Sequence, residues 1–122
     1  MITSKDLLLK AFILDAGGVI SFLKTAVMPE IDENFLETTS AIELLKMIYS
    51  SYFIEFDKLR EKIVDDEFQL LGIKYVFERL YTTLFFSTDE VIESGTKIEF
   101  SIAFTQINRG PNVDNMAELS QS

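Results

Sequence analysis

Residues 42–63 read IELLKMIYSSYFIEFDKLREKI, and their apolar positions recur every three or four residues. The apolar series consists of Ile42, Leu45, Tyr49, Tyr52, Phe56, Leu59 and Ile63. This spacing is typical of an amphipathic helix with one apolar face, here called the 42–63 seam. The opposite side carries polar residues such as Glu43, Lys46 and Asp57. We therefore expect a long helix, around which the rest of the domain packs.

Signals for helix starts and breaks lie on the amino-terminal side of this seam. Ser40 is followed three residues later by Glu43, which is the spacing of a capping box. Thr3 provides a second cap, ahead of apolar residues at helical spacing. Gly17 and Gly18 interrupt that spacing, because adjacent glycines are costly inside a helix. The first 28 residues therefore predict two short helices, or one helix broken at the glycines.

The carboxy-terminal third has a different period. Ile98, Phe100, Ile102 and Phe104 alternate with polar or small residues, which predicts a β-strand over 97–106. One strand is not stable alone, so it needs a neighbour, either 80–86 of this chain or a strand of another subunit. Gly72 is expected to end a preceding helix. The pattern of 73–86 fits either a helix or a strand, and we expect a helix through about residue 82.

These patterns together predict an α+β fold. The helical amino-terminal two-thirds would pack with a small antiparallel sheet near the carboxyl terminus. Residues 1–107 are expected to form a single globular domain, which is an ordinary size for one domain. Residues 108–122 are rich in amides and contain Gly110 and Pro111, so we expect a polar carboxy-terminal tail.

The composition excludes most kinds of catalysis. The chain contains no Cys and no His, which removes thiolate and imidazole metal ligands and the usual general base near neutral pH. Catalytic sites of the Ser–His–Asp and Cys–His type are excluded with them. We therefore predict that the protein is not an enzyme. We expect it to have no catalytic residues, no metal, no cofactor and no small-molecule substrate.

The charge also limits the partners. The net charge is −9, from 20 acidic and 11 basic side chains, so phosphate backbones and anionic membrane surfaces are disfavoured. No apolar run approaches the roughly 20 residues that cross a bilayer, and the amino terminus lacks the layout of a secretory signal. We expect a cytoplasmic protein, or a virion protein if it belongs to a particle, with protein partners only.

One string of residues resembles an enzyme motif. Residues 12–20 read FILDAGGVI, which resembles the first motif of the haloacid-dehalogenase superfamily. The resemblance implies that Asp15 is a nucleophile delivered by a strand of a parallel sheet, with Asp65 and Asp66 as magnesium ligands. This sequence departs from the family pattern, because those enzymes place far more chain between the two motifs and residues 4–10 favour a helix. Our prediction therefore stays with a non-enzymatic protein.

The leading functional hypothesis is a structural or assembly subunit of a larger homo-oligomer, concretely a component of a viral or phage particle. Strands and tails exchanged between protomers would carry the assembly. The predicted interface residues are Tyr49, Tyr52, Ile98, Phe100, Ile102, Phe104, Val113, Met116 and Leu119.

The alternative hypothesis is an acidic inhibitor or immunity-type protein that blocks a basic, nucleic-acid-binding site on its partner. Its candidate carboxylates are Glu30, Asp32, Glu33, Glu37, Asp65, Asp66 and Glu67. Binding that weakens steeply with added salt would favour this alternative, whereas salt-insensitive self-assembly would favour the assembly subunit.

Overall fold

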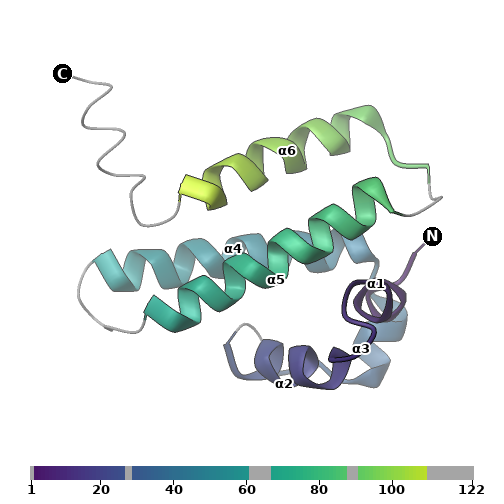
Figure 1. The fold of residues 1–122 in the computed structure, drawn as a ribbon, viewed down its shortest axis with the longest axis horizontal. Helices are drawn as coiled ribbons and strands as arrows, with labels where there is room; N and C mark the ends of the chain where they lie inside the picture. The colour runs from purple at the N-terminus through teal and green to yellow at the C-terminus, as the bar shows by residue number, and fades with distance from the viewer. Residues whose placement is uncertain (1, 27–28, 61–66, 88–90, 110–122) are drawn as a thin grey trace.

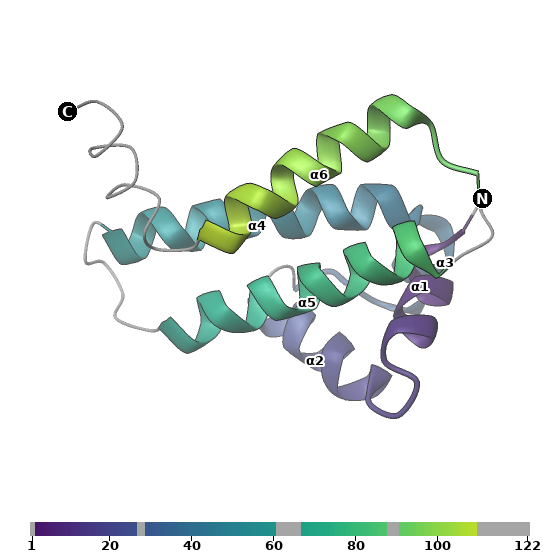
Figure 2. The same ribbon diagram turned by 45° about the horizontal axis from the view of Figure 1, so that its top comes forward.

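The computed structural model describes residues 2–26, 29–60, 67–87 and 91–109. These residues form six α-helices: α1 (Ser4–Ala11), α2 (Ala16–Ala26), α3 (Glu33–Thr38), α4 (Ala41–Arg60), α5 (Glu67–Phe86) and α6 (Ser94–Arg109). The long helices α4 and α5 lie side by side, and α6 covers one side of this pair (Figure 1). Helix α2 lies on the opposite side, while α1 and α3 pack at one end (Figures 1 and 2).

The predicted long helix is confirmed as α4 through residue 60, and the end of the predicted range, 61–63, lies outside the described residues. Its capping residue is the predicted one, because the Ser40 hydroxyl accepts a hydrogen bond from the Glu43 N–H at 3.2 Å. The buried positions of α4 are Ala41, Leu44, Leu45, Ile48, Tyr52 and Phe56. Ile42 and Tyr49 of the 42–63 seam are only half-buried, so the face that packs against α5 is rotated slightly from the predicted one.

The amino-terminal segment is tied to the start of α4 by hydrogen bonds. Thr3 caps α1, since its hydroxyl accepts from the Asp6 N–H at 3.2 Å, as the sequence predicts. Thr3 also forms an isolated antiparallel bridge with Ser40. The fully buried Ser4 hydroxyl lies 2.9 Å from the Thr39 carbonyl oxygen, to which it donates. These bonds hold α1 beside the α3–α4 junction and satisfy a polar group that burial would otherwise penalise.

The predictions made from the glycine residues are only partly confirmed. Two short helices, α1 and α2, form as expected, but Gly17 and Gly18 lie in the first turn of α2 and the break is a turn at 13–15. The prediction that Gly72 ends a helix is wrong, because it lies inside α5. A Cβ at this position would lie 2.6 Å from Cζ of Phe22 in α2. The glycine is therefore needed for the close approach of a neighbouring helix.

The predicted α+β fold is wrong. The described residues contain no strand: 97–106 lies within α6, and 80–86 belongs to α5, which stays helical beyond the predicted limit at residue 82. The alternating apolar residues are compatible with a helix because each residue turns by about 100°. Phe100 and Phe104 then share one side of α6, while Ile98 and Ile102 share the opposite side. The alternating pattern therefore places two apolar pairs on opposite sides of one helix.

Aromatic contacts attach α6 to α5. The Phe104 ring stacks on Tyr81 with a centroid distance of 4.6 Å and an interplanar angle of 13°. Phe100 is buried, and its ring centroid lies 5.7 Å from that of Phe85. Ile107 is also fully buried at the other end of the helix. These contacts bury one side of α6 and leave its other side to solvent.

Two features predicted from the sequence lie mostly or wholly outside the described residues. Residues 110–122, most of the predicted tail, lie outside the described residues, and α6 itself runs through Asn108 and Arg109. The paired carboxylates Asp65 and Asp66 also lie outside the part of the chain that the structure describes.

Candidate interaction surfaces

The predicted interface residues of α6 are divided between its two sides. Ile98 is 62% exposed and Ile102 is 56% exposed, so both are available to a partner. Phe100 is 2% exposed, and Phe104 is half-buried against Tyr81. Of the four residues expected to share one strand face, only the two isoleucines therefore lie at the surface.

The two predicted interface tyrosines are used inside the domain. Tyr52 is fully buried, and its hydroxyl lies 3.4 Å from the Ile107 carbonyl oxygen. Burial raises the pKa of Tyr52 to about 12, because the ionised phenolate would lose its hydration. The half-buried Tyr49 donates a hydrogen bond from its hydroxyl to Oε1 of Gln106. Both tyrosines thus connect α4 to α6. The other predicted interface residues, Val113, Met116 and Leu119, lie outside the described residues.

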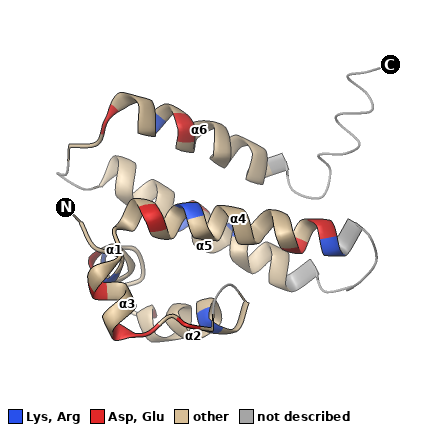
Figure 3. Cartoon of the chain, turned by 180° about the vertical axis from the view of Figure 1, so that it is seen from behind, with Lys and Arg blue, Asp and Glu red and all other residues tan. Residues whose placement is uncertain are grey.

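The solvent-facing side of α6 has an unusual composition, and we call it the outer α6 face. Its exposed residues are Ser94, Gly95, Ile98, Ser101, Ile102 and Thr105. None is charged, and the steps from 95 to 98, 102 and 105 follow the three-and-four spacing of a helix–helix contact. Lys97 and Glu99 lie in the first half of α6, and Arg109 is its last residue. In Figure 3 the charged residues coloured on α6 lie toward the end where the helix begins.

A hollow of about 290 Å³ borders the outer α6 face. It lies between the end of α5 and α6, and its walls include Tyr81, Phe85, Phe86, Lys97, Ile98 and Ser101. Phe86 is 74% exposed at this edge. Ile98, Ile102 and Phe86 are therefore large apolar side chains that stay exposed on the side of the molecule that carries α6, although the core of the single chain does not use them.

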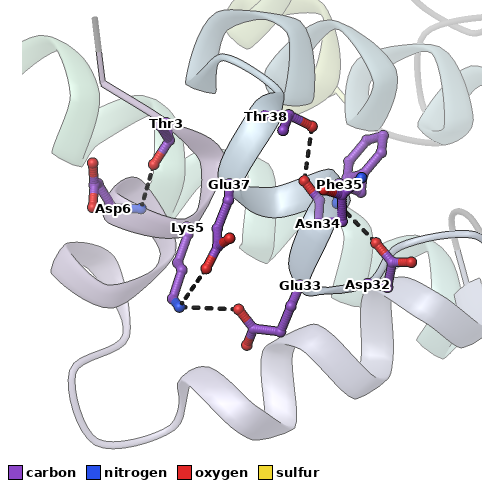
Figure 4. A network of polar contacts seen from close by, with 9 residues as sticks. All are labelled: Thr3, Lys5, Asp6, Asp32, Glu33, Asn34, Phe35, Glu37 and Thr38. Carbon is purple, nitrogen blue, oxygen red and sulfur yellow. Dashed lines mark hydrogen bonds and ion pairs between the residues drawn. The ribbon is translucent and has the colours of Figure 1, made fainter.

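The acidic residues near α3 have partners within the fold, as Figure 4 shows. Asp32 caps α3, since its Oδ1 accepts from the Phe35 N–H at 2.7 Å. The Lys5 ammonium lies 3.0 Å from Glu33 Oε2 and 3.2 Å from Glu37 Oε1. The hydrogen bond to Glu33, then the one to Glu37, raises the pKa of Lys5. The cluster therefore fastens α1 to α3, although its carboxylates remain exposed.

The arrangement implied by the dehalogenase resemblance is not found. Asp15 lies in the turn between α1 and α2, where the resemblance requires a strand end, and the described residues contain no sheet. Asp15 is exposed, and its carboxylate lies against Gly18 in the first turn of α2. Within the described ranges, no group of three or more Asp or Glu residues is arranged to hold a metal ion.

A second cavity, which we call the α2–α5 cavity, lies on the side of the molecule away from α6. It measures about 300 Å³. Its walls include the rings of Phe12, Phe22 and Tyr75, and within the described part of the chain Asp15 is the one charged residue that lines it. The sequence did not predict it, because its walls come from three segments that only the tertiary fold brings together. The sequence marks Gly72 as a residue with a structural role, but the role that it predicts is a helix end.

Comparisons with known proteins identify no relative of this chain. None of the helices in the described part of the chain is long and apolar enough to span a membrane. The chain matches no protein family, no curated protein and no solved structure. Function is therefore inferred from the surfaces of the chain itself.

Proposed function

We propose that the protein is a non-enzymatic assembly subunit that associates with further copies of itself through the outer α6 face, as a component of a larger homo-oligomer such as a viral particle. The observation that carries the proposal is an uncharged helix face with two exposed isoleucines in a chain of net charge −9. The protomer's own core does not use this face. Its apolar residues become useful when a second surface covers them.

The geometry of the outer α6 face suits a second α6. Gly95, Ser101 and Thr105 are small, and a Cβ at Gly95 would meet no other atom within 4 Å. Small residues beside larger ones let two helices approach closely and interlock. In an antiparallel pair with its twofold axis near residue 100, Ile98 of one copy faces Ile102 of the other. Such a contact uses the same patch on both subunits, as a twofold dimer requires.

The energetic gain is substantial for so few residues. Ile98 and Ile102 are 62% and 56% exposed, so burying what remains of each contributes about 1–2 kcal/mol, and a symmetric pair buries each of them twice. Few charged groups lose hydration in this contact, because the face itself carries none. The exposed Phe86 at the edge of the face would add to the buried area.

The test compares two substitutions with the same chemistry. Ile102 on α6 and Ile54 on α4 are each 56% exposed. Ile102→Glu places a charge in the proposed contact, whereas Ile54→Glu makes the same change in charge and exposure elsewhere. We expect wild type and Ile54→Glu to be oligomeric by light scattering and native mass spectrometry, and Ile102→Glu to be monomeric. A wild-type protein that stays monomeric at high concentration would overturn the proposal.

We do not propose the inhibitor function. Three of its candidate carboxylates, those of Asp32, Glu33 and Glu37, already have partners within the fold. Asp65 and Asp66 lie outside the described residues. The described carboxylates therefore do not favour a charge-mimicking face over a structural use of the same groups.

A further inference from the structure

The α2–α5 cavity and the turn beside it form a second apolar surface. Ile13 and Leu14 are 82% and 96% exposed, between the cavity residues Phe12 and Asp15. We propose that this surface binds a segment of a partner protein that carries an apolar side chain next to a lysine or arginine. The apolar side chain would enter the cavity, and the cation would pair with Asp15.

The cavity is built to accept an apolar side chain. Its volume of about 300 Å³ is at the lower end of the range for ligand pockets, and three aromatic rings line it. Gly72 lets the Phe22 ring, which forms one wall, lie directly against α5, because a Cβ at residue 72 would collide with that ring. An aliphatic or aromatic side chain of a partner would gain burial there without moving the helices.

The rim extends the apolar surface beyond the cavity. Tyr75 is 57% exposed, and Leu71 lies one turn earlier on α5 and is 51% exposed. Ile13 and Leu14 belong to the turn before α2, between the lining residues Phe12 and Asp15. A free small molecule within the cavity would leave these exposed neighbouring residues uncovered, whereas a peptide segment is long enough to contact them as well. This arrangement favours a peptide as the occupant.

The charge of the site selects a basic segment. Asp15 is the only charged residue among the described residues that line the cavity, and the chain as a whole carries −9. The guanidinium of Arg79 has other partners, since it donates to the Ala11 carbonyl oxygen at 2.8 Å and lies 5.7 Å from the centroid of the Phe12 ring. A cationic group of a partner would find the Asp15 carboxylate together with the rings of Phe22 and Tyr75.

The experiment uses three capped peptides that differ only in charge: acetyl-Leu-Phe-Lys-amide, acetyl-Leu-Phe-Gln-amide and acetyl-Leu-Phe-Glu-amide. Binding is followed in the full chain through the NMR amide signals of Gly18 and Gly72. We expect the lysine peptide to bind roughly three- to tenfold more tightly than the glutamine peptide. The glutamate peptide should bind most weakly.

Two variants assign the charge preference to one carboxylate. Asp15→Asn should bring the lysine and glutamine peptides to equal affinity. Asp6→Asn removes an exposed carboxylate that does not line the cavity, and should leave the preference unchanged. The proposal is overturned if wild type does not prefer the lysine peptide, if the preference survives in Asp15→Asn, or if no peptide shifts the two glycine signals.

Two further measurements define the occupant and its independence from α6. The double change Ile13→Ser and Leu14→Ser should weaken all three peptides alike, because both side chains are exposed and lie on the rim. Phenethylammonium that bound as tightly as the lysine peptide and ignored this change would replace the peptide by a free amine. Ile102→Glu should leave peptide binding intact, so failure of either proposal is distinguishable from failure of the other.

Discussion

Tyr52 shows how a single buried hydroxyl makes stability depend on pH. Its ring is fully buried between α4 and α6, and burial raises its pKa to about 12, from an ordinary value of 10. Between these two values, the unfolded chain has released the phenolic proton while the folded chain still holds it. The unfolded state then binds fewer protons, so the free energy of unfolding falls as the pH rises.

We therefore expect wild type to lose more stability than Tyr52→Phe between pH 10 and pH 12, by about 1–3 kcal/mol. Urea denaturation of both proteins across this range measures the difference. Absorbance titration should show one tyrosine that ionises late in the folded wild type and is missing from the variant. Parallel stability curves for the two proteins would contradict the burial of this hydroxyl.

Gly72 shows how one missing side chain sets the distance between two helices. Alanine is favoured over glycine in a helix by about 1 kcal/mol, but a Cβ at residue 72 meets only the Phe22 ring within 3 Å. In wild type, Gly72→Ala should therefore be destabilising, with overpacking costing about 1–3 kcal/mol before the helix gain is subtracted.

The sign should reverse when the ring is removed. In a Phe22→Ala background, the same Gly72→Ala change should stabilise the protein, because only the helix propensity remains. Thermal or urea denaturation of the four proteins forms a double-mutant cycle. Gly17→Ala, where a Cβ would meet nothing within 4 Å, serves as the control and should not be destabilising in either background. No change of sign at residue 72 would contradict the close approach of α2 and α5.

At the scale of one element, α6 carries two apolar pairs with different tasks. Phe100 and Phe104 contact the rings of Phe85 and Tyr81 and fix the helix to the core. Ile98 and Ile102 lie on the outer α6 face, where the protomer has no use for them. A strand would place all four side chains on one face, so the consequences of substitution differ between the two structures.

Alanine substitutions separate these structures. Phe100→Ala should cost about 3–5 kcal/mol of unfolding free energy, and Phe104→Ala somewhat less because its ring is only half-buried. Ile98→Ala and Ile102→Ala should change the stability of the monomer by at most about 0.5 kcal/mol. Urea denaturation at a low protein concentration, where association is negligible, measures all four. Similar losses at all four positions would indicate a buried strand face.

At the scale of the whole molecule, α6 and α2 lie on opposite sides of the α4–α5 pair (Figures 1 and 2), and each contributes to one apolar surface. The outer α6 face carries no charge, whereas the α2–α5 cavity is bordered by Asp15. A subunit of this design could join copies of itself on one side and recruit a basic partner on the other. The net charge of −9 affects the two contacts in opposite directions.

The two contacts should therefore differ in how their affinity depends on salt concentration. Self-association through the outer α6 face should be unchanged or stronger at 500 mM than at 50 mM salt, because salt screens the mutual repulsion of two acidic subunits. Binding of the lysine peptide should weaken over the same range, since its charge contact is screened. Sedimentation velocity and NMR titration measure the two. Self-association that weakened steeply with salt would contradict an uncharged contact and revive a charge-mediated one.

The local features that the sequence determined were those fixed by neighbouring residues. The helix at 42–63, the cap at Ser40 and the cap at Thr3 were predicted because each depends on spacing within one or two turns. The absence of Cys and His likewise excluded whole classes of chemistry without any structure. These conclusions need only the chain's own order.

Only the tertiary structure decided that 97–106 is helical and that Gly72 is a packing position. An alternating apolar pattern satisfies a strand with one buried face or a helix with two apolar sides, and contacts with Tyr81 and Phe85 favour the helix here. Gly72 signals a helix end in isolation, yet Phe22, 50 residues away in the chain, makes it a packing position. Local patterns cannot contain this information, because it resides in the side chains that the fold brings opposite to them.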